Sequence, residues 1–148
     1  MSDWNARYQG EDYAFGTEPN EFVLSIIHHL PKSGRALDLA TGEGRNAVWL
    51  AWEVCAVDFT DVGLHKGRDL AARRGVAERV CFEAADLRCY RPEPGGFDLV
   101  TDVELAALRV SRGADETANL RMNDGQCLYL VRFMPGKRRL RRFRLSRG

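Results

Sequence analysis

The chain has 148 residues, which is the usual size of one domain and leaves no room for two full ones. Apolar residues make up 45% of the sequence and charged residues 29%, a composition that supports a packed core and excludes a disordered chain. The 22 Lys and Arg nearly balance the 21 Asp and Glu, so the formal net charge is only +1.

The charges are nevertheless divided unevenly along the chain. From Arg132 to the C-terminus there are eight basic residues and no acidic one, so the rest of the chain carries 14 basic against 21 acidic residues. The acidic body argues against a nucleic-acid-binding fold. The basic segment, in contrast, is suited to contact phosphate or an acidic partner.

The four cysteines do not have metal-ligand spacing, because no C-x-x-C pair occurs and no histidine stands at zinc-ligand spacing. We therefore expect no metal site. No apolar run reaches the roughly 18 residues of a membrane span, and the first 20 residues do not resemble a signal peptide. These features predict a reducing, cytoplasmic location without membrane contact.

Helix and strand signals alternate along the chain. Asn20 is a suitable N-cap for an amphipathic helix that reaches about Leu30, and Asp61 for a longer helix that stops at Gly75. The predicted elements in chain order are a helix over 20–30, a strand over 35–40, a helix over 45–52, a strand over 54–57, a helix over 62–74, strands over 80–82 and 97–100, a weak helix over 103–108 and a strand over 127–133.

This alternation is typical of a parallel sheet with right-handed crossovers and helices on both faces. We therefore expect an α/β fold, a Rossmann-like doubly wound sheet that is mostly parallel and has about five strands. The domain would span residues 1–134, with an aromatic N-terminal segment and helix in 1–34, and residues 135–148 would form a basic C-terminal tail. In such sheets ligands bind at the carboxyl ends of the strands.

A strand breaks into a glycine turn that opens a helix in Leu37-Asp38-Leu39-Ala40-Thr41-Gly42-Glu43-Gly44-Arg45-Asn46-Ala47. Gly42 and Gly44 let the backbone approach a ligand closely. The spacing matches the dinucleotide fingerprint G-x-G-x-x-A, but Glu43 would place a carboxylate beside a diphosphate. S-adenosylmethionine has no phosphate and carries a cationic ammonium and sulfonium, so Asp38 and Glu43 favour that cofactor.

Acidic residues also end the next two predicted strands. Asp58 closes the second strand, where a carboxylate can accept hydrogen bonds from ribose hydroxyls. Asp86 ends the third strand and is placed to bind an adenine amino group, while Phe59 would lie against the ring. Asp is frequent in turns, so the joint placement of three strand-end acids, rather than any one of them, predicts a nucleoside site.

These residues resemble the motifs of the class I S-adenosylmethionine-dependent methyltransferases and, within them, the tellurite-resistance-type methyltransferases. The resemblance covers about residues 4–100 and is most specific over residues 37–51. The other matching pieces are Trp4-Asn5-Ala6-Arg7-Tyr8, Asp12-Tyr13-Ala14-Phe15-Gly16-Thr17-Glu18-Pro19-Asn20, Ala56-Val57-Asp58-Phe59-Thr60, Gly63-Leu64, Ala85-Asp86-Leu87 and Phe97-Asp98-Leu99-Val100.

The resemblance implies that the glycine loop holds the methionine part of the cofactor, that Asp58 binds ribose, and that Asp86 and Leu87 lie at adenine. It also implies that the aromatic N-terminal segment folds over the cofactor, although the same aromatics are equally suited to a core. The expected cofactor-binding residues are Asp38, Ala40, Gly42, Glu43, Gly44, Asn46, Asp58, Phe59, Asp86, Leu87, Tyr8 and Tyr13.

The chain departs from this family in two places. Only 14 residues separate Gly44 from Asp58, and no glycine turn joins helix to strand, so we expect a strained first crossover. After about residue 100 the chain looks truncated or divergent, because the family's last helix and its two antiparallel strands should follow Phe133. A sheet cut in this way leaves an edge that costs stability or pairs with another chain.

The sequence therefore predicts an S-adenosylmethionine-dependent methyltransferase that acts on a small molecule, such as a thiol or a chalcogen oxyanion, by in-line methyl transfer. Its activity would be impaired by the missing C-terminal part. No catalytic residue is assigned, because a thiolate or a reduced chalcogen oxyanion needs no proton removed. The alternatives are a degenerate methyltransferase-like binding protein whose basic tail contacts nucleic acid or an acidic partner, a nicotinamide-linked oxidoreductase, and a terminal segment without a selected role.

Overall fold

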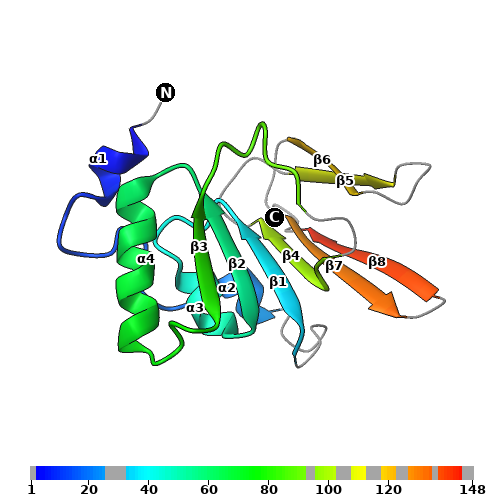
Figure 1. Ribbon diagram of the computed structural model, residues 1–148, viewed down its shortest axis with the longest axis horizontal. Coiled ribbons are helices and arrows are strands. Elements are labelled where there is room, and N and C mark those ends of the chain that lie inside the picture. Colours follow the sequence, from blue (N-terminus) through cyan, green and yellow to red (C-terminus); the bar gives the residue numbers. More distant parts are fainter. Residues whose placement is uncertain are drawn as a thin grey trace.

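A six-stranded sheet in the order β3-β2-β1-β4-β7-β8 forms the centre of the protein (Figure 1). The computed structural model describes residues 3–25, 33–92, 96–102, 108–112, 118–122, 127–134 and 137–144. The strands of this sheet are β1 (Arg35–Leu39), β2 (Glu53–Asp58), β3 (Val80–Ala84), β4 (Leu99–Asp102), β7 (Cys127–Met134) and β8 (Lys137–Arg144). A separate antiparallel pair consists of β5 (Leu108–Arg112) and β6 (Ala118–Met122).

The first four strands of the sheet are parallel. Leu37 of β1 lies opposite Cys55 of β2 on one side and Val100 of β4 on the other, and Cys55 in turn lies opposite Cys81 of β3. The carboxyl ends of all four strands therefore meet at one edge, as the alternating pattern predicted. This arrangement is the Rossmann-like α/β fold expected from the sequence.

Among the described residues, helices α2 (Glu21–Ser25), α3 (Arg45–Leu50) and α4 (Asp61–Arg73) cover one face of the parallel strands (Figure 1). A further helix, α1 (Trp4–Tyr8), lies against α4. The buried residues where α2 and α3 meet this face are Val23, Ala36, Ala47, Leu50, Val54, Ala56, Val80 and Leu99. The predicted helix over 20–30 is thus observed up to Ser25, and its remainder lies outside the described residues. Over the described part of the chain, no helix is long and apolar enough to cross a membrane.

The opposite face of the sheet differs from the expectation. Leu37, Leu39, Val57 and Val100 are buried there, but the residues packed on them include Ala85, Leu87, Tyr90 and Phe97, which follow β3 without forming a helix. Helices on both faces were expected because strands and helices alternate in the sequence. Among the described residues, the β3–β4 connection replaces a helix with an irregular segment.

The C-terminal part of the chain also differs from the expected fifth strand and tail. β7 runs antiparallel to β4, and residues 137–144, expected in a tail, pair with β7 as strand β8. The sheet therefore has six strands rather than about five, and two of them are antiparallel. Met134 pairs with Lys137, so only two residues, a Pro and a Gly, join the strands, and such a short connection enforces an antiparallel return.

The stretch after β4 was expected to contain a weak helix over 103–108. Leu108 instead begins strand β5, which pairs antiparallel with β6. Leu108 lies opposite Met122 at one end of the pair, and Arg112 lies opposite Ala118 at the other. Residues 103–107 lie outside the described residues. The expectation was wrong for Leu108 because cross-strand pairing overrides a weak local helix preference.

The first crossover carries the strain that its short spacing predicted. Helix α3 has six residues, and its C-cap Ala51 adopts φ 48° and ψ 28°. This left-handed conformation is the one that glycine commonly supplies after a helix, and a Cβ atom makes it unfavourable. The chain therefore enters β2 through a strained alanine.

Replacing Ala51 with glycine should stabilise the protein. A left-handed alanine costs about 1–2 kcal/mol and glycine's extra freedom in the unfolded chain costs about 0.5–1 kcal/mol, so the expected net gain is about 0.5–1 kcal/mol. Urea denaturation of Ala51→Gly measures this gain. The control is Ala72→Gly, at an exposed helical position in α4, which should lose about 1 kcal/mol. An Ala51→Gly variant as destabilised as the control would contradict the assignment of strain.

Helix α4 approaches the loop between β1 and α3 very closely at Gly63. A Cβ atom there would lie 2.8 Å from the carbonyl oxygen of Gly42, 2.7 Å from Thr60 Oγ1 and 3.0 Å from Tyr8 Cδ2. Backbone and buried side chains surround this point, so glycine is required for the close approach.

Gly63→Ala should therefore destabilise the protein although alanine is the better helix former. Overpacking costs about 1–3 kcal/mol and exceeds the helix gain, which predicts a net loss of about 1–2 kcal/mol in urea denaturation. Gly10→Ala is the matched control, because a Cβ atom at Gly10 meets nothing within 4 Å. Equal stability of the two variants would show that α4 and the loop are not in tight contact.

Candidate functional site

The loop that connects β1 to α3, residues 40–44, turns through left-handed backbone conformations. The φ angles are 52° at Ala40, 56° at Gly42 and 78° at Gly44. The Thr41 amide donates to the Val57 carbonyl oxygen at 3.1 Å, which ties the loop to β2. A left-handed alanine is unfavourable by itself, so tertiary contacts must hold the loop in this shape.

Asp58, at the carboxyl end of β2, provides the main contacts of this kind. It is 5% exposed. Its Oδ2 accepts a hydrogen bond from the Gly42 amide at 2.8 Å, and its Oδ1 accepts from the Thr60 amide at 2.9 Å and the Thr60 hydroxyl at 2.8 Å. A carboxylate has about four acceptor positions, so one is left for a further donor such as a hydroxyl group.

Thr60 stands at the N-cap position of α4, and Asp61 is the first helical residue. The sequence analysis assigned the cap to Asp61, which would leave Asp58 without a local role. In the structure Asp58 binds the residue at the N-cap and thereby fixes the start of α4. The carboxylate therefore joins the glycine loop, β2 and α4.

Asp38 joins the loop to β4. It is 2% exposed, its Oδ2 accepts a hydrogen bond from the Thr41 hydroxyl at 2.7 Å, and its Oδ1 accepts one from the hydroxyl of Thr101. Thr101 lies opposite Asp38 in the neighbouring strand. This buried contact fixes the carboxyl ends of β1 and β4 relative to the start of the loop.

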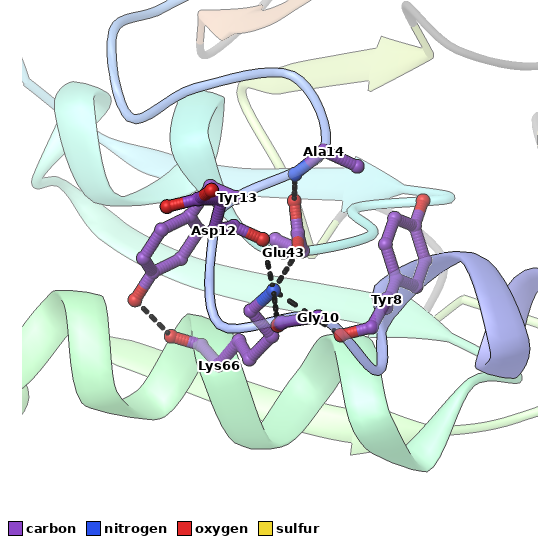
Figure 2. A network of polar contacts seen from close by, with 7 residues as sticks. All are labelled: Tyr8, Gly10, Asp12, Tyr13, Ala14, Glu43 and Lys66. Atoms are coloured by element: carbon purple, nitrogen blue, oxygen red, sulfur yellow. Dashed lines mark hydrogen bonds and ion pairs between the residues drawn. The ribbon is translucent and has the colours of Figure 1, made fainter.

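Glu43 lies in the loop and forms a buried ion pair with Lys66 of α4 (Figure 2). The Lys66 Nζ is 2.6 Å from Glu43 Oε1, and the two side chains are 12% and 3% exposed. Glu43 Oε2 accepts a hydrogen bond from the Ala14 amide at 2.8 Å. The negative charge that we set against a diphosphate is thus compensated, so Glu43 discriminates between ligands less strongly than the sequence suggested.

Lys66 also binds the N-terminal segment, residues 8–14. Its ammonium donates to the carbonyl oxygens of Tyr8 at 3.1 Å, Gly10 at 3.0 Å and Asp12 at 2.7 Å. The Tyr13 hydroxyl donates to the Lys66 carbonyl oxygen at 3.1 Å, and the ammonium lies 5.0 Å from the Tyr13 ring centroid. The sequence analysis did not identify Lys66, whose signal is its position on the buried side of α4, three residues after Gly63.

The other predicted residues near the loop also contact the N-terminal part of the chain. Asn46, in the first turn of α3, is 4% exposed and accepts a hydrogen bond from the Asn20 amide at 2.8 Å. Tyr8 is 3% exposed, and Tyr13 packs against the cluster of Val48, Leu70 and Ala71. Both tyrosines contribute to the core, and their predicted place over a cofactor stays a prediction.

The residues predicted to lie at adenine differ in their surroundings. Phe59 follows Asp58 and is 54% exposed, whereas Leu87 packs against the buried residues of the opposite sheet face. Asp86 is exposed, and the Arg88 guanidinium lies 2.6 Å from its Oδ2. The hydrogen bonds from Arg88 lower the pKa of Asp86 to about 2. The Asp86 carboxylate therefore already binds a cation, and its contact with adenine stays a prediction.

The structure thus brings most of the predicted residues together around one loop. Asp38 binds the loop at Thr41 and Asp58 binds it at Gly42, whereas Asn46 binds the Asn20 amide. Tyr8 and Tyr13 contact Lys66, which pairs with Glu43 of the loop. Asp86 and Leu87 lie on the β3–β4 connection with other partners. Within the described ranges, no group of three or more His, Cys, Asp or Glu side chains is arranged to hold a metal ion.

A family model described as a methyltransferase domain matches residues 36–121, which is more than half of the chain. No curated protein sequence matches the chain. Similar solved structures include YjhP from E. coli, with a TM-score of 0.57 and 19% identity over 70% of this chain and 44% of that one.

Two further similar structures are complexes with S-adenosyl-L-homocysteine. A SAM-dependent methyltransferase from Thiobacillus denitrificans has a TM-score of 0.57 and 18% identity, covering 70% of this chain and 44% of that one. A SAM-dependent methyltransferase from Geobacter sulfurreducens has a TM-score of 0.52 and 19% identity, covering 64% and 40%.

The chain spans less than half of the length of these three structures, and identities of 18–19% show a shared fold. The match to the family model runs from β1 into β6 and includes the glycine loop, Asp58 and α4. The chain therefore belongs to the methyltransferase domain family.

Proposed function

We propose that the chain binds S-adenosylmethionine at the carboxyl ends of β1 and β2 and is part of a methyltransferase that acts on a small molecule. One observation carries the proposal: Asp58 holds the glycine loop while Phe59, the next residue, is 54% exposed. Family membership supports this cofactor, as do the two similar structures in complex with S-adenosyl-L-homocysteine.

The residues at this edge fit the chemistry of the cofactor. Asp58 keeps one acceptor position for a ribose hydroxyl, and the exposed ring of Phe59 offers an aromatic face to a purine. The three hydrogen-bond donors on Asp58 are two amides and a hydroxyl, all uncharged, so its negative charge is able to attract a ligand cation. The main electrostatic preference for a sulfonium or ammonium therefore falls on Asp58 rather than Glu43.

The chain's own groups would act mainly by positioning. S-adenosylmethionine supplies a methyl group activated by its sulfonium. The glycine loop and Asp58 would orient the nucleoside and methionine parts, and the N-terminal segment held by Lys66 would exclude water. We propose an acceptor that is already anionic, such as a thiolate or a chalcogen oxyanion, as in the tellurite-resistance-type enzymes, because it needs no general base. We also propose that the protein is cytoplasmic and that the reaction uses no metal ion.

S-adenosylhomocysteine should raise the midpoint of thermal unfolding, because a ligand of the native state stabilises it. At 100 times its Kd the gain is about 2.7 kcal/mol, which corresponds to a rise of about 5–10 °C in a domain of this size. Differential scanning fluorimetry measures the shift, and NAD at the same concentration serves as the control.

The possible results separate the candidate functions. No response to millimolar S-adenosylhomocysteine would reject the proposal. A response to NAD alone would favour the nicotinamide-linked oxidoreductase, and the absence of any response would favour the degenerate binding protein with its basic C-terminal segment.

Asp58→Asn should weaken both the fold and cofactor binding. The amide replaces one acceptor oxygen with a donor, so it opposes either the Gly42 amide or the Thr60 donors. An unsatisfied buried group costs about 1–3 kcal/mol, and the Kd for S-adenosylhomocysteine should rise at least tenfold. Calorimetry and urea denaturation measure the two effects. Asp69→Asn, at an exposed acid of α4, should change stability by less than about 0.5 kcal/mol and leave the Kd unaltered. If Asp58→Asn behaves like this control, Asp58 does not organise the site.

A further inference from the structure

The N-terminal segment and the glycine loop meet at one ammonium group. Figure 2 shows the Lys66 ammonium between them, with dashed lines to Glu43 and to the carbonyl groups of Tyr8, Gly10 and Asp12. Because three carbonyl groups of alternate residues bind one nitrogen atom, the backbone of the segment curves around the ammonium. Lys66 therefore holds residues 8–12 against α4.

Burial makes the two sides depend on each other. Lys66 is 12% exposed and Glu43 is 3% exposed, so neither charge is well hydrated. If the segment moves away, Lys66 loses three acceptors and Glu43 loses the Ala14 amide. If the ammonium is removed, Glu43 keeps a buried charge without its cation, which strongly destabilises that arrangement.

Glu43 links the docking of residues 8–14 to the conformation of the glycine loop. It stands between Gly42, whose amide is bound by Asp58, and Gly44, the N-cap of α3. A change in its side chain would shift both neighbours. The segment reaches the same loop at a second point, because the Tyr8 ring and the Gly42 carbonyl oxygen both pack against Gly63.

We propose that Lys66 is a positioning residue that couples docking of residues 8–14 to the shape of the glycine loop, so that the cofactor binds tightly when the segment is docked. This inference rests on the proposed S-adenosylmethionine site and adds the residue that prepares it. Lys66 acts through Glu43 and the segment. Coupling is reciprocal, so the cofactor must strengthen docking by the same factor by which docking strengthens cofactor binding.

The test uses Lys66→Met, which keeps most of the apolar stem and removes the ammonium. Hydrogen exchange with mass spectrometry follows the amides of residues 8–14, and calorimetry gives the Kd of S-adenosylhomocysteine. We expect exchange in this segment to become at least tenfold faster and the Kd to rise at least tenfold. Saturating ligand should slow exchange of the segment in the unaltered protein and fail to do so in the variant.

Arg74→Gln is the matched control. Arg74 also joins α4 to the N-terminal part of the chain, through Glu18 at 3.1 Å, but the two side chains are 48% and 79% exposed. Exposed pairs contribute little to stability. Both the exchange rate of residues 8–14 and the Kd should therefore stay within about twofold of the original values.

Glu43→Gln and the double variant Glu43→Gln/Lys66→Met separate coupling from a general loss of stability. The double variant contains no unpaired buried charge and keeps the test available if Lys66→Met does not fold. Because both residues act through one contact, the double variant should bind S-adenosylhomocysteine no more weakly than the weaker single variant. Additive losses in Kd would overturn the proposal.

Two further results would also overturn it. One is release of the segment in Lys66→Met with an unchanged Kd. The other is a lower melting temperature with unchanged exchange of residues 8–14 and an unchanged Kd. Either result would leave Lys66 a purely structural role. Failure of the unaltered protein to bind S-adenosylhomocysteine would reject the proposed cofactor and its coupling. Exchange measured without ligand would still decide whether Lys66 holds the segment.

Discussion

The carboxylate of Asp58 connects three elements of the fold: strand β2, the glycine loop after β1 and the start of helix α4. It ends β2, accepts a hydrogen bond from the Gly42 amide in the loop after β1, and fixes Thr60 at the start of α4. Because the group is buried, each of these contacts matters more than it would at the surface. The left-handed turn at Ala40, the close approach of α4 at Gly63 and the exposed Phe59 all lie within two or three residues of Asp58 or of the groups that it binds.

Two of the three buried acids at this edge, Glu43 and Asp58, have different electrostatic surroundings. Glu43 is paired with an ammonium, so its charge serves mainly to hold the loop and the N-terminal segment together. The hydrogen-bond donors on Asp58 are uncharged, so its field reaches further towards a ligand. Asp58 is therefore the acid to which our proposal assigns the attraction for the cofactor's cationic groups, whereas Glu43 holds two parts of the chain together. The chain belongs to the methyltransferase domain family, as the carboxylate of Glu43 suggested, but in the structure that carboxylate is paired with Lys66.

Local patterns were sufficient to predict the parallel strands, the glycine loop and α4, because apolar runs, glycine turns and helix caps are properties of neighbouring residues. The place of Lys66 on the buried side of α4 does not reveal its partners, since these lie more than 20 residues away in the loop and more than 50 residues away in the N-terminal segment. The direction of β7 was also outside the reach of local pattern, because an isolated strand looks the same in a parallel or an antiparallel pair. Arg88 differs from these cases, because it follows Asp86 by only two residues and was missed because it lies outside the matching motif Ala85-Asp86-Leu87.

The basic segment acquires a physical role from its place in the sheet. Six of the eight residues of β8 are Lys or Arg, and β8 is the outermost strand beside β7. An unpaired edge invites another strand, but a strand with this charge repels a second copy of itself and is poorly suited to stack into larger sheets. By its composition, the edge that we expected to seek a neighbour is therefore a poor template for a further strand. The net charge of +1 thus combines an acidic body and a basic edge strand. The acidic body has buried carboxylates at its strand ends, and the basic strand β8 lies at the opposite edge of the sheet from β3.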